Sequence, residues 1–80
     1  MKNKFVITVV GRDTVGIIAK VCTYLADHQV NILDISQTIV DGYFNMMMIV
    51  DAANAGDVTE MSGDLAALGQ EIGVVIRCQH

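Results

Sequence analysis

The chain has 80 residues, a formal net charge of −4, 52% hydrophobic residues and no proline. This length allows one small hydrophobic core, so we expect a single domain over residues 1–80, and the apolar content excludes a disordered linker. Because only five residues are Lys or Arg, direct binding to nucleic acid or to a membrane is not expected. The sequence shows neither an apolar run of about 20 residues nor a signal peptide, which predicts a cytoplasmic protein.

The chain begins with a predicted strand that is followed by a predicted helix. Residues 4–10 are rich in β-branched side chains and are followed by Gly11, which marks the end of the strand. Apolar residues recur at helical spacing within residues 14–28 and predict a helix. No glycine follows this helix, so Gln29 would have to adopt a left-handed conformation at a cost of about 1 kcal/mol.

A hairpin is predicted next. Residues 31–40 alternate apolar and polar side chains, and residues 43–51 do the same, so both segments are predicted to be strands. Between them, residues 41–42 are Asp-Gly, which is typical of a tight turn. We expect these side chains of the first three strands to point toward the helices: Phe5, Ile7, Val9, Leu33, Ile35, Phe44, Met46 and Met48.

The last third of the chain predicts a second helix and a final strand. Asp57 and Glu60 lie three positions apart and resemble a capping box in front of a helical apolar pattern. We expect Gly69 to end this helix as its C-cap. Residues 73–79 are predicted to form the last strand.

The element order β-α-β-β-α-β predicts an α+β, ferredoxin-like fold, in which a four-stranded antiparallel sheet carries two helices on one face. The other face of the sheet would then be open. Its residues are expected to be Val6, Thr8, Val10, Asn45, Met47, Ile49 and Val75. Because the first and third strands are central in this topology, the apolar members would form one contiguous patch, and such a patch usually marks a contact surface. We therefore expect a homodimer or a homotetramer.

The segment between the first strand and the first helix, residues 11–17, reads Gly-Arg-Asp-Thr-Val-Gly-Ile. A helix that begins directly behind a strand leaves its first backbone N–H groups without partners, at the positive end of the helix dipole. Such a helix start is a small polar cup that suits a carboxylate or a phosphate. The cup is therefore the first candidate for a binding site.

This motif resembles the ACT domain, a regulatory module that binds amino acids. The resemblance rests on residues 11–17, on Val-Asn-Ile at residues 30–32, on Asn-Ile-Leu-Asp-Ile-Ser-Gln at 31–37 and on Asp-Gly-Tyr-Phe at 41–44. It covers about residues 3–79. Within the family, the chain is similar to small stand-alone ACT proteins and to the ACT domains of the glycine cleavage system transcriptional repressor and of formyltetrahydrofolate deformylase.

The resemblance implies a ligand site between two subunits, formed by the first strand–helix loop of one chain and the start of the second strand of its neighbour. By position, the site residues are Asp13, Val15, Gly16, Ile17 and Ile18, together with Asn31 of the neighbour. For an α-amino acid, Asp13 would pair with the ammonium group and the N–H groups of residues 16–18 would bind the carboxylate. The amide of Asn31 could do either.

Two positions differ from ligand-binding members of the family. Val15 stands where many of them have proline, and Gly11 stands where the serine-binding members have histidine. The resemblance therefore does not identify the ligand.

Each of these residues also has a purely structural interpretation. Asp13 or Thr14 can serve only as the N-cap of the first helix. Gly16 can mark a point of close helix–sheet packing, and Asn31 can serve the turn before its strand. These alternatives stay open at the level of the sequence.

Catalysis and metal binding are not expected. Arg12 stands in a loop that cradles a phosphoryl group in acylphosphatases, but the other signature residues of that loop are absent. The methionines at residues 46–48 alternate between the two faces of a strand, so they cannot converge on one ion. Cys22 and Cys78 are too few for a disulfide framework and are expected to be small core residues.

The sequence therefore predicts a non-catalytic regulatory domain that binds a small molecule of the amino-acid class at the interface of a homo-oligomer. No cofactor is expected. The ligand would act allosterically, by altering the subunit interface or the docking of a regulated protein partner. The alternative is a ligand-free protein–protein interaction module of the same fold.

Overall fold

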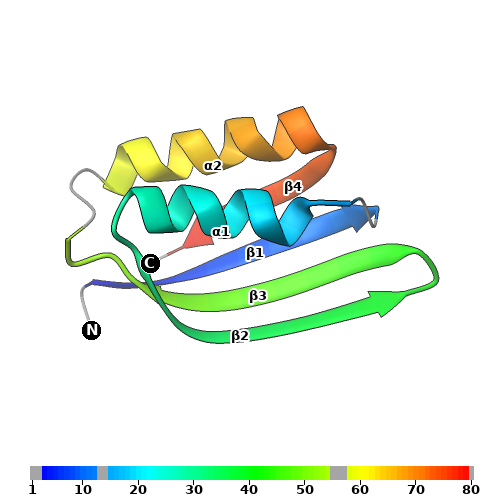
Figure 1. The fold of residues 1–80 in the computed structure, drawn as a ribbon, viewed down its shortest axis with the longest axis horizontal. Helices are drawn as coiled ribbons and strands as arrows, with labels where there is room; N and C mark the ends of the chain where they lie inside the picture. Colours follow the sequence, from blue (N-terminus) through cyan, green and yellow to red (C-terminus); the bar gives the residue numbers. More distant parts are fainter. Residues whose placement is uncertain (1–2, 13–14, 55–57, 80) are drawn as a thin grey trace.

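The computed structural model describes residues 3–12, 15–54 and 58–79. In chain order these residues form β1 (Lys4–Arg12), α1 (Ile17–Asp27), β2 (Asn31–Val40), β3 (Tyr43–Asp51), α2 (Val58–Ile72) and β4 (Val74–Gln79). The strands form one antiparallel sheet in the order β2-β3-β1-β4, and both helices lie on the same side of it (Figure 1). The predicted ferredoxin-like α+β fold is confirmed.

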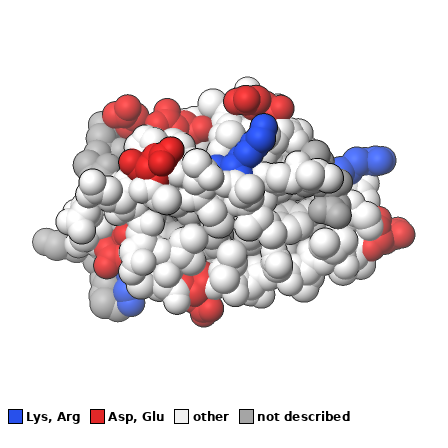
Figure 2. Space-filling view, in the orientation of Figure 1, with Lys and Arg blue, Asp and Glu red and all other residues white. Residues whose placement is uncertain are grey.

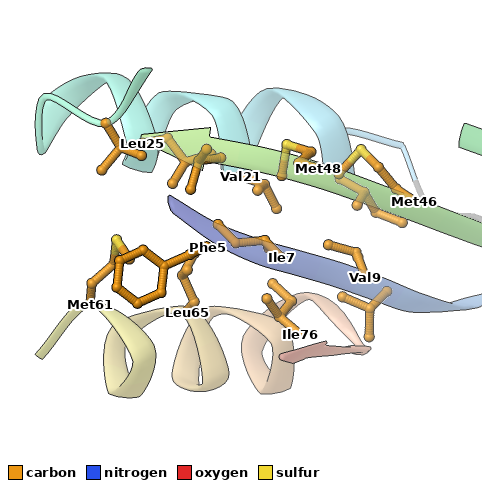
Figure 3. Close-up of a cluster of buried hydrophobic side chains, with 14 of the residues drawn as sticks. Phe5, Ile7, Val9, Val21, Leu25, Met46, Met48, Met61, Leu65 and Ile76 are labelled. Atoms are coloured by element: carbon orange, nitrogen blue, oxygen red, sulfur yellow. The ribbon is translucent and has the colours of Figure 1, made fainter. Parts of the chain in front are cut away.

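The hydrophobic core lies between the sheet and the two helices. Alternate residues of β1 and β3 are buried, as the period of two of a strand requires when one face is covered. Figure 3 shows side chains from α1, such as Val21 and Leu25, and from α2, such as Leu65, converging on Ile7 and Met48 of the central strands. Met46 and Met48 are fully buried whereas Met47 is exposed, so the three methionines do not converge.

The first strand does not end at Gly11, as the sequence suggested, but continues to Arg12. Gly11 pairs with Phe44 on one side and with Val74 on the other. A Cβ atom at this position would lie 2.8 Å from Cγ1 of Val74. Glycine is therefore required here because β4 passes close to the backbone, and it does not interrupt the strand.

Helix α1 begins at Ile17, three residues later than predicted. Its N-cap is Gly16, which has a φ of 90° and makes no side-chain capping hydrogen bond. A Cβ atom at Gly16 would have no neighbour within 4 Å, so this glycine serves the backbone conformation and not close packing. The capping residues that the sequence suggested, Asp13, Thr14 and Asp57, lie outside the described residues.

The ends of both helices are set by left-handed residues. Gln29 has a φ of 60°, as predicted, and the N–H of Val30 donates to the carbonyl of Leu25 at 2.9 Å. Helix α2 continues past Gly69 to Ile72, and Gly73 with a φ of 84° follows it, so the prediction that Gly69 is the C-cap is wrong. The glycine that ends the helix lies four residues further on.

Strand β2 departs from the predicted pattern because it contains an irregularity between Ile32 and Asp34. Leu33 lies at this bulge, has no partner in the strand register and is 45% exposed, so it does not join the core. Ile35 lies opposite the buried Met48 and therefore faces the helix side, but it is 44% exposed because β2 is an edge strand. The turn after β2 is as predicted, with a positive φ at both Asp41 and Gly42.

Candidate functional site

A hollow of about 510 Å³ lies at the start of α1, where the helix meets the sheet. Its wall from the loop and the helix consists of Val15, Gly16, Ile17, Ile18 and Ala19, and its wall from the sheet consists of Gln37, Ile39 and Phe44. The structure thus brings four of the predicted site residues, Val15 to Ile18, into one hollow. Asp13, which was also predicted, lies outside the described residues.

The three sheet residues of the hollow were missed by sequence reasoning. Ile39 lies directly opposite Phe44 across the hairpin, and Gly11 lies opposite Phe44 on the other side. This register places the end of β2 at the same level as the end of β1, from which the loop to α1 departs, with β3 between the two strands. The predicted hairpin turn was enough to place Ile39 opposite Phe44. The pairing of β1 with β3 was also needed to bring this end of the hairpin to the loop before α1.

The backbone at the start of α1 gives the hollow its polar side. The carbonyl of Gly16 accepts the first helical hydrogen bond, from the N–H of Lys20 at 2.9 Å. The N–H groups of residues 17–19 precede that bond and have no acceptor within the helix. They point toward the N-terminal end of the helix, where the helix dipole is positive. A carboxylate or another small anion fits this end of the hollow.

The rest of the hollow is largely apolar. Ile17 and Phe44 form its buried floor, whereas Ile39 is 59% exposed at its rim. Gln37 supplies a polar side chain with one acceptor oxygen and two donor hydrogens. The hollow can therefore hold a small molecule that has a charged end near α1 and an apolar part against the end of β2.

Asn31, the remaining predicted site residue, does not reach this hollow within one chain. It is the first residue of β2 and pairs with Asp51, whereas the hollow lies near the last residues of the same strand. Eight residues of extended chain separate Asn31 from Ile39, a distance of about 25 Å. Figure 1 shows the start of α1 and the end of β2 at one end of the molecule and the start of β2 at the other.

The surface charge does not favour a nucleic-acid interface. On the face seen in Figure 2, acidic side chains outnumber basic ones, and the basic side chains lie apart from one another. Among the described residues, no group of three or more His, Cys, Asp or Glu side chains could hold a metal ion. Cys22 and Cys78 are free thiols. In the described part of the chain, no helix has the length and apolarity that a membrane crossing needs.

The fold and the hollow together define a class: a ferredoxin-like α+β domain with a ligand-sized hollow between its first strand–helix loop and an edge strand. The family model described as ACT domain matches residues 3–79. The chain therefore belongs to the ACT domain family.

Individual relatives agree with this assignment. A UPF0237 protein of Bifidobacterium longum is 72% identical over 79 residues, which cover 98% of this chain and 88% of that protein. The solved structure of an ACT domain protein from Streptococcus pneumoniae is 43% identical, with a TM-score of 0.85 over 95% of this chain and 86% of that one. A putative glycine cleavage system transcriptional repressor is 25% identical, with a TM-score of 0.85 over 95% of this chain and 44% of that one.

Proposed function

We propose that this protein is a non-catalytic, cytoplasmic regulatory domain that binds an α-amino acid between two copies of itself. The observation that carries the proposal is the hollow at the start of α1, which combines free helix N–H groups with an apolar wall. One ACT domain spans the chain in this proposal. The resemblance of the sequence to ACT domains implies that Asp13 belongs to the site, as the partner of the ligand's ammonium group.

The position of β2 explains how Asn31 would contribute. β2 is an edge strand, so its outer backbone groups are available to pair with another strand. If two β2 strands pair antiparallel across a two-fold axis, the start of one strand lies beside the end of the other. The partner subunit's Asn31 would then lie beside the end of β2, at the rim of the hollow.

The same pairing would cover apolar side chains that a single chain exposes. Ile18, Ile35 and Ile39 are all partly exposed on the helix side of this edge. Their burial would stabilise the pair, at about 25 cal/mol for each Å² of apolar surface removed from water. A ligand bound between the subunits would then shift the equilibrium between separate and paired chains, because it binds the paired state more tightly.

The first test is thermal unfolding, followed by circular dichroism, in a panel of amino acids at millimolar concentration. A ligand at about 100 times its dissociation constant stabilises the folded state by about 2.7 kcal/mol, which raises the melting temperature by several degrees. Asn31→Ala should abolish the shift, whereas Asn45→Ala, on the open face of the sheet and outside the hollow, should leave it unchanged. A panel without any shift would contradict the proposal and favour the ligand-free interaction module.

Mixing variants tests whether the site is shared between chains. Asp13→Ala and Asn31→Ala should each abolish binding, whereas Asp13→Asn, which keeps the size of the side chain but not its charge, should keep the stability of the fold. When the two inactive variants are unfolded together and refolded as an equal mixture, half of the pairs contain both kinds of chain. Each mixed pair has one intact site, so about a quarter of all sites should bind ligand again. No recovery would contradict a site that is shared between two chains.

A further inference from the structure

One polar side chain interrupts the apolar row that β2 presents on the helix side of the sheet. Gln37 lies opposite the buried Met46, so it points to the same side as Ile35 and Ile39, which lie two residues before and after it. Gln37 also lines the hollow at the start of α1. The alternation of the strand favours an apolar residue at this position, so the pattern of the strand does not account for the glutamine.

The side-chain amide of Gln37 has hydrogen-bonding capacity that the fold does not use. It offers one acceptor oxygen and two donor hydrogens. Within residues 3–12, 15–54 and 58–79, no hydrogen bond joins this amide to another residue. In a single chain the side chain is exposed, so water satisfies it. The ligand and the β2 pairing of the proposed function would displace this water, and a covered amide requires a new partner.

The rest of the hollow offers no charge to the side chain of a ligand. None of the described residues that line it is Asp, Glu, Lys or Arg. Asp13 lies outside the described residues, and the proposed function assigns it to the ammonium group. A ligand with a charged side chain would therefore lose its water without gaining an ion pair. A ligand with an entirely apolar side chain would leave the amide of Gln37 covered and unpaired.

We propose that the amino acid bound here carries a side-chain amide, as asparagine and glutamine do, and that Gln37 selects it. This inference rests on the proposed function, because it names the class of ligand for the same site. A primary amide presents one acceptor and two donors, so it can exchange two N–H···O hydrogen bonds with Gln37. Its methylene groups would pack against Ile39 and Phe44, which lie opposite each other in the wall from the sheet. The carboxylate stays at the N–H groups of α1.

Amino acids of matched size test this selection, with dissociation constants derived from the melting temperature as a function of ligand concentration. Glutamine, glutamate and methionine have side chains of nearly equal length that contain an amide, a carboxylate and a thioether. Asparagine, aspartate and leucine form a shorter set of the same kind. In the set that binds more tightly, the wild-type chain should bind the amide at least about tenfold more tightly than its two analogues, because only the amide satisfies Gln37.

Gln37→Met tests the role of the residue itself, because it removes the amide and nearly keeps the length of the side chain. It should weaken binding of the amide ligand at least about tenfold and abolish the preference over the apolar analogue, since the ligand amide then has no partner. Gln70→Met is the matched control, because Gln70 is exposed on α2 and does not line the hollow. It should keep the wild-type preference. Circular dichroism can confirm that both variants fold.

The outcomes separate this inference from the proposed function. If the carboxylate or the apolar analogue binds as tightly as the amide, the selection is overturned and an amino-acid site still stands. If Gln37→Met weakens all three ligands of a set by the same factor, the inference is also overturned, because Gln37 would then contact the groups that all amino acids share. A panel without any shift would contradict the proposed function and this inference with it.

Discussion

At the scale of single residues, Tyr24 of α1 makes a polar contact with α2. Its hydroxyl donates a hydrogen bond of 2.8 Å to Oδ2 of Asp64 on α2. Its ring stacks on His28, with 4.0 Å between ring centroids, and Nδ1–H of His28 donates to the carbonyl of Tyr24 at 2.9 Å. Burial and the hydrogen bond to Asp64 raise the pKa of the Tyr24 phenol well above its ordinary value of 10.0.

Replacing Tyr24 by Phe should reduce the free energy of unfolding by about 1 kcal/mol, because the ring is kept while the hydrogen bond to Asp64 is lost. Urea unfolding at neutral pH measures this change. Tyr43→Phe is the matched control, because Tyr43 is 55% exposed, and it should change the stability by less than about 0.5 kcal/mol. An equal effect of the two substitutions would show that the contact with Asp64 contributes nothing.

The same substitution should change the response to alkaline pH. A pKa that is raised in the folded state means that the unfolded chain loses its proton first, so stability is intact below pH 10 and falls as the pH rises further. Burial also raises the pKa of the Cys78 thiol above its ordinary value of 9.0, which adds a loss of the same sign. In Tyr24→Phe the decline above pH 10 should be shallower, and the part due to Cys78 should remain.

At the scale of elements, two glycines of α2 have opposite roles. A Cβ atom at Gly69 would lie 2.7 Å from the backbone carbonyl oxygen of Val74 and 3.1 Å from Ile76, so only glycine lets β4 pack this close to the helix. A Cβ atom at Gly63 would meet nothing within 4 Å. Glycine is unfavourable in a helix interior by about 1 kcal/mol relative to alanine. Gly69 is therefore retained for space, whereas Gly63 has no such requirement.

These roles predict opposite effects of the same substitution in one helix. Gly69→Ala should destabilise the protein by about 1–3 kcal/mol, because the backbone of β4 has to move away. Gly63→Ala should stabilise it by about 0.5–1 kcal/mol through helix propensity alone. Denaturant unfolding of both variants checks the pair. If Gly69→Ala were as stable as Gly63→Ala, the close approach of α2 and β4 would be wrong.

At the scale of the whole molecule, stability depends on how much apolar surface is removed from water. A chain of 80 residues buries only about 60% of the surface that it exposes when unfolded, so its stability alone is small. The helices cover one face of the sheet, and the edge at β2 and the open face both keep exposed apolar side chains. Assembly would add burial that a single chain cannot supply.

The melting temperature should therefore depend on protein concentration, rising by a few degrees for a tenfold increase, because assembly stabilises only the folded state. Met47→Glu places a charge in the middle of the open face and should reduce this dependence while leaving the fold intact, since Met47 is 51% exposed. Lys20→Gln on α1 makes the same change in net charge and should keep the dependence. A melting temperature that does not change with concentration in the wild-type chain would contradict assembly.

The sequence alone was sufficient for the element order, the fold class and the faces of the central strands. These follow from local periodicity and from turn signals such as Asp41-Gly42, which act over a few residues and need no tertiary information. The resemblance to the ACT domain also pointed to Val15 to Ile18 as site residues, although the start of the helix was predicted three residues too early.

Only the tertiary structure decided how these parts meet. Gly69 looked like a helix end, but its neighbour in space is Val74 of β4, and that close approach is invisible in the helical pattern. The bulge that removes Leu33 from the core depends on the register of β2 against β3. Gln37, Ile39 and Phe44 join the hollow only because β1 pairs with β3. Pairing between distant segments sets these contacts, and a local pattern does not encode which segments will pair.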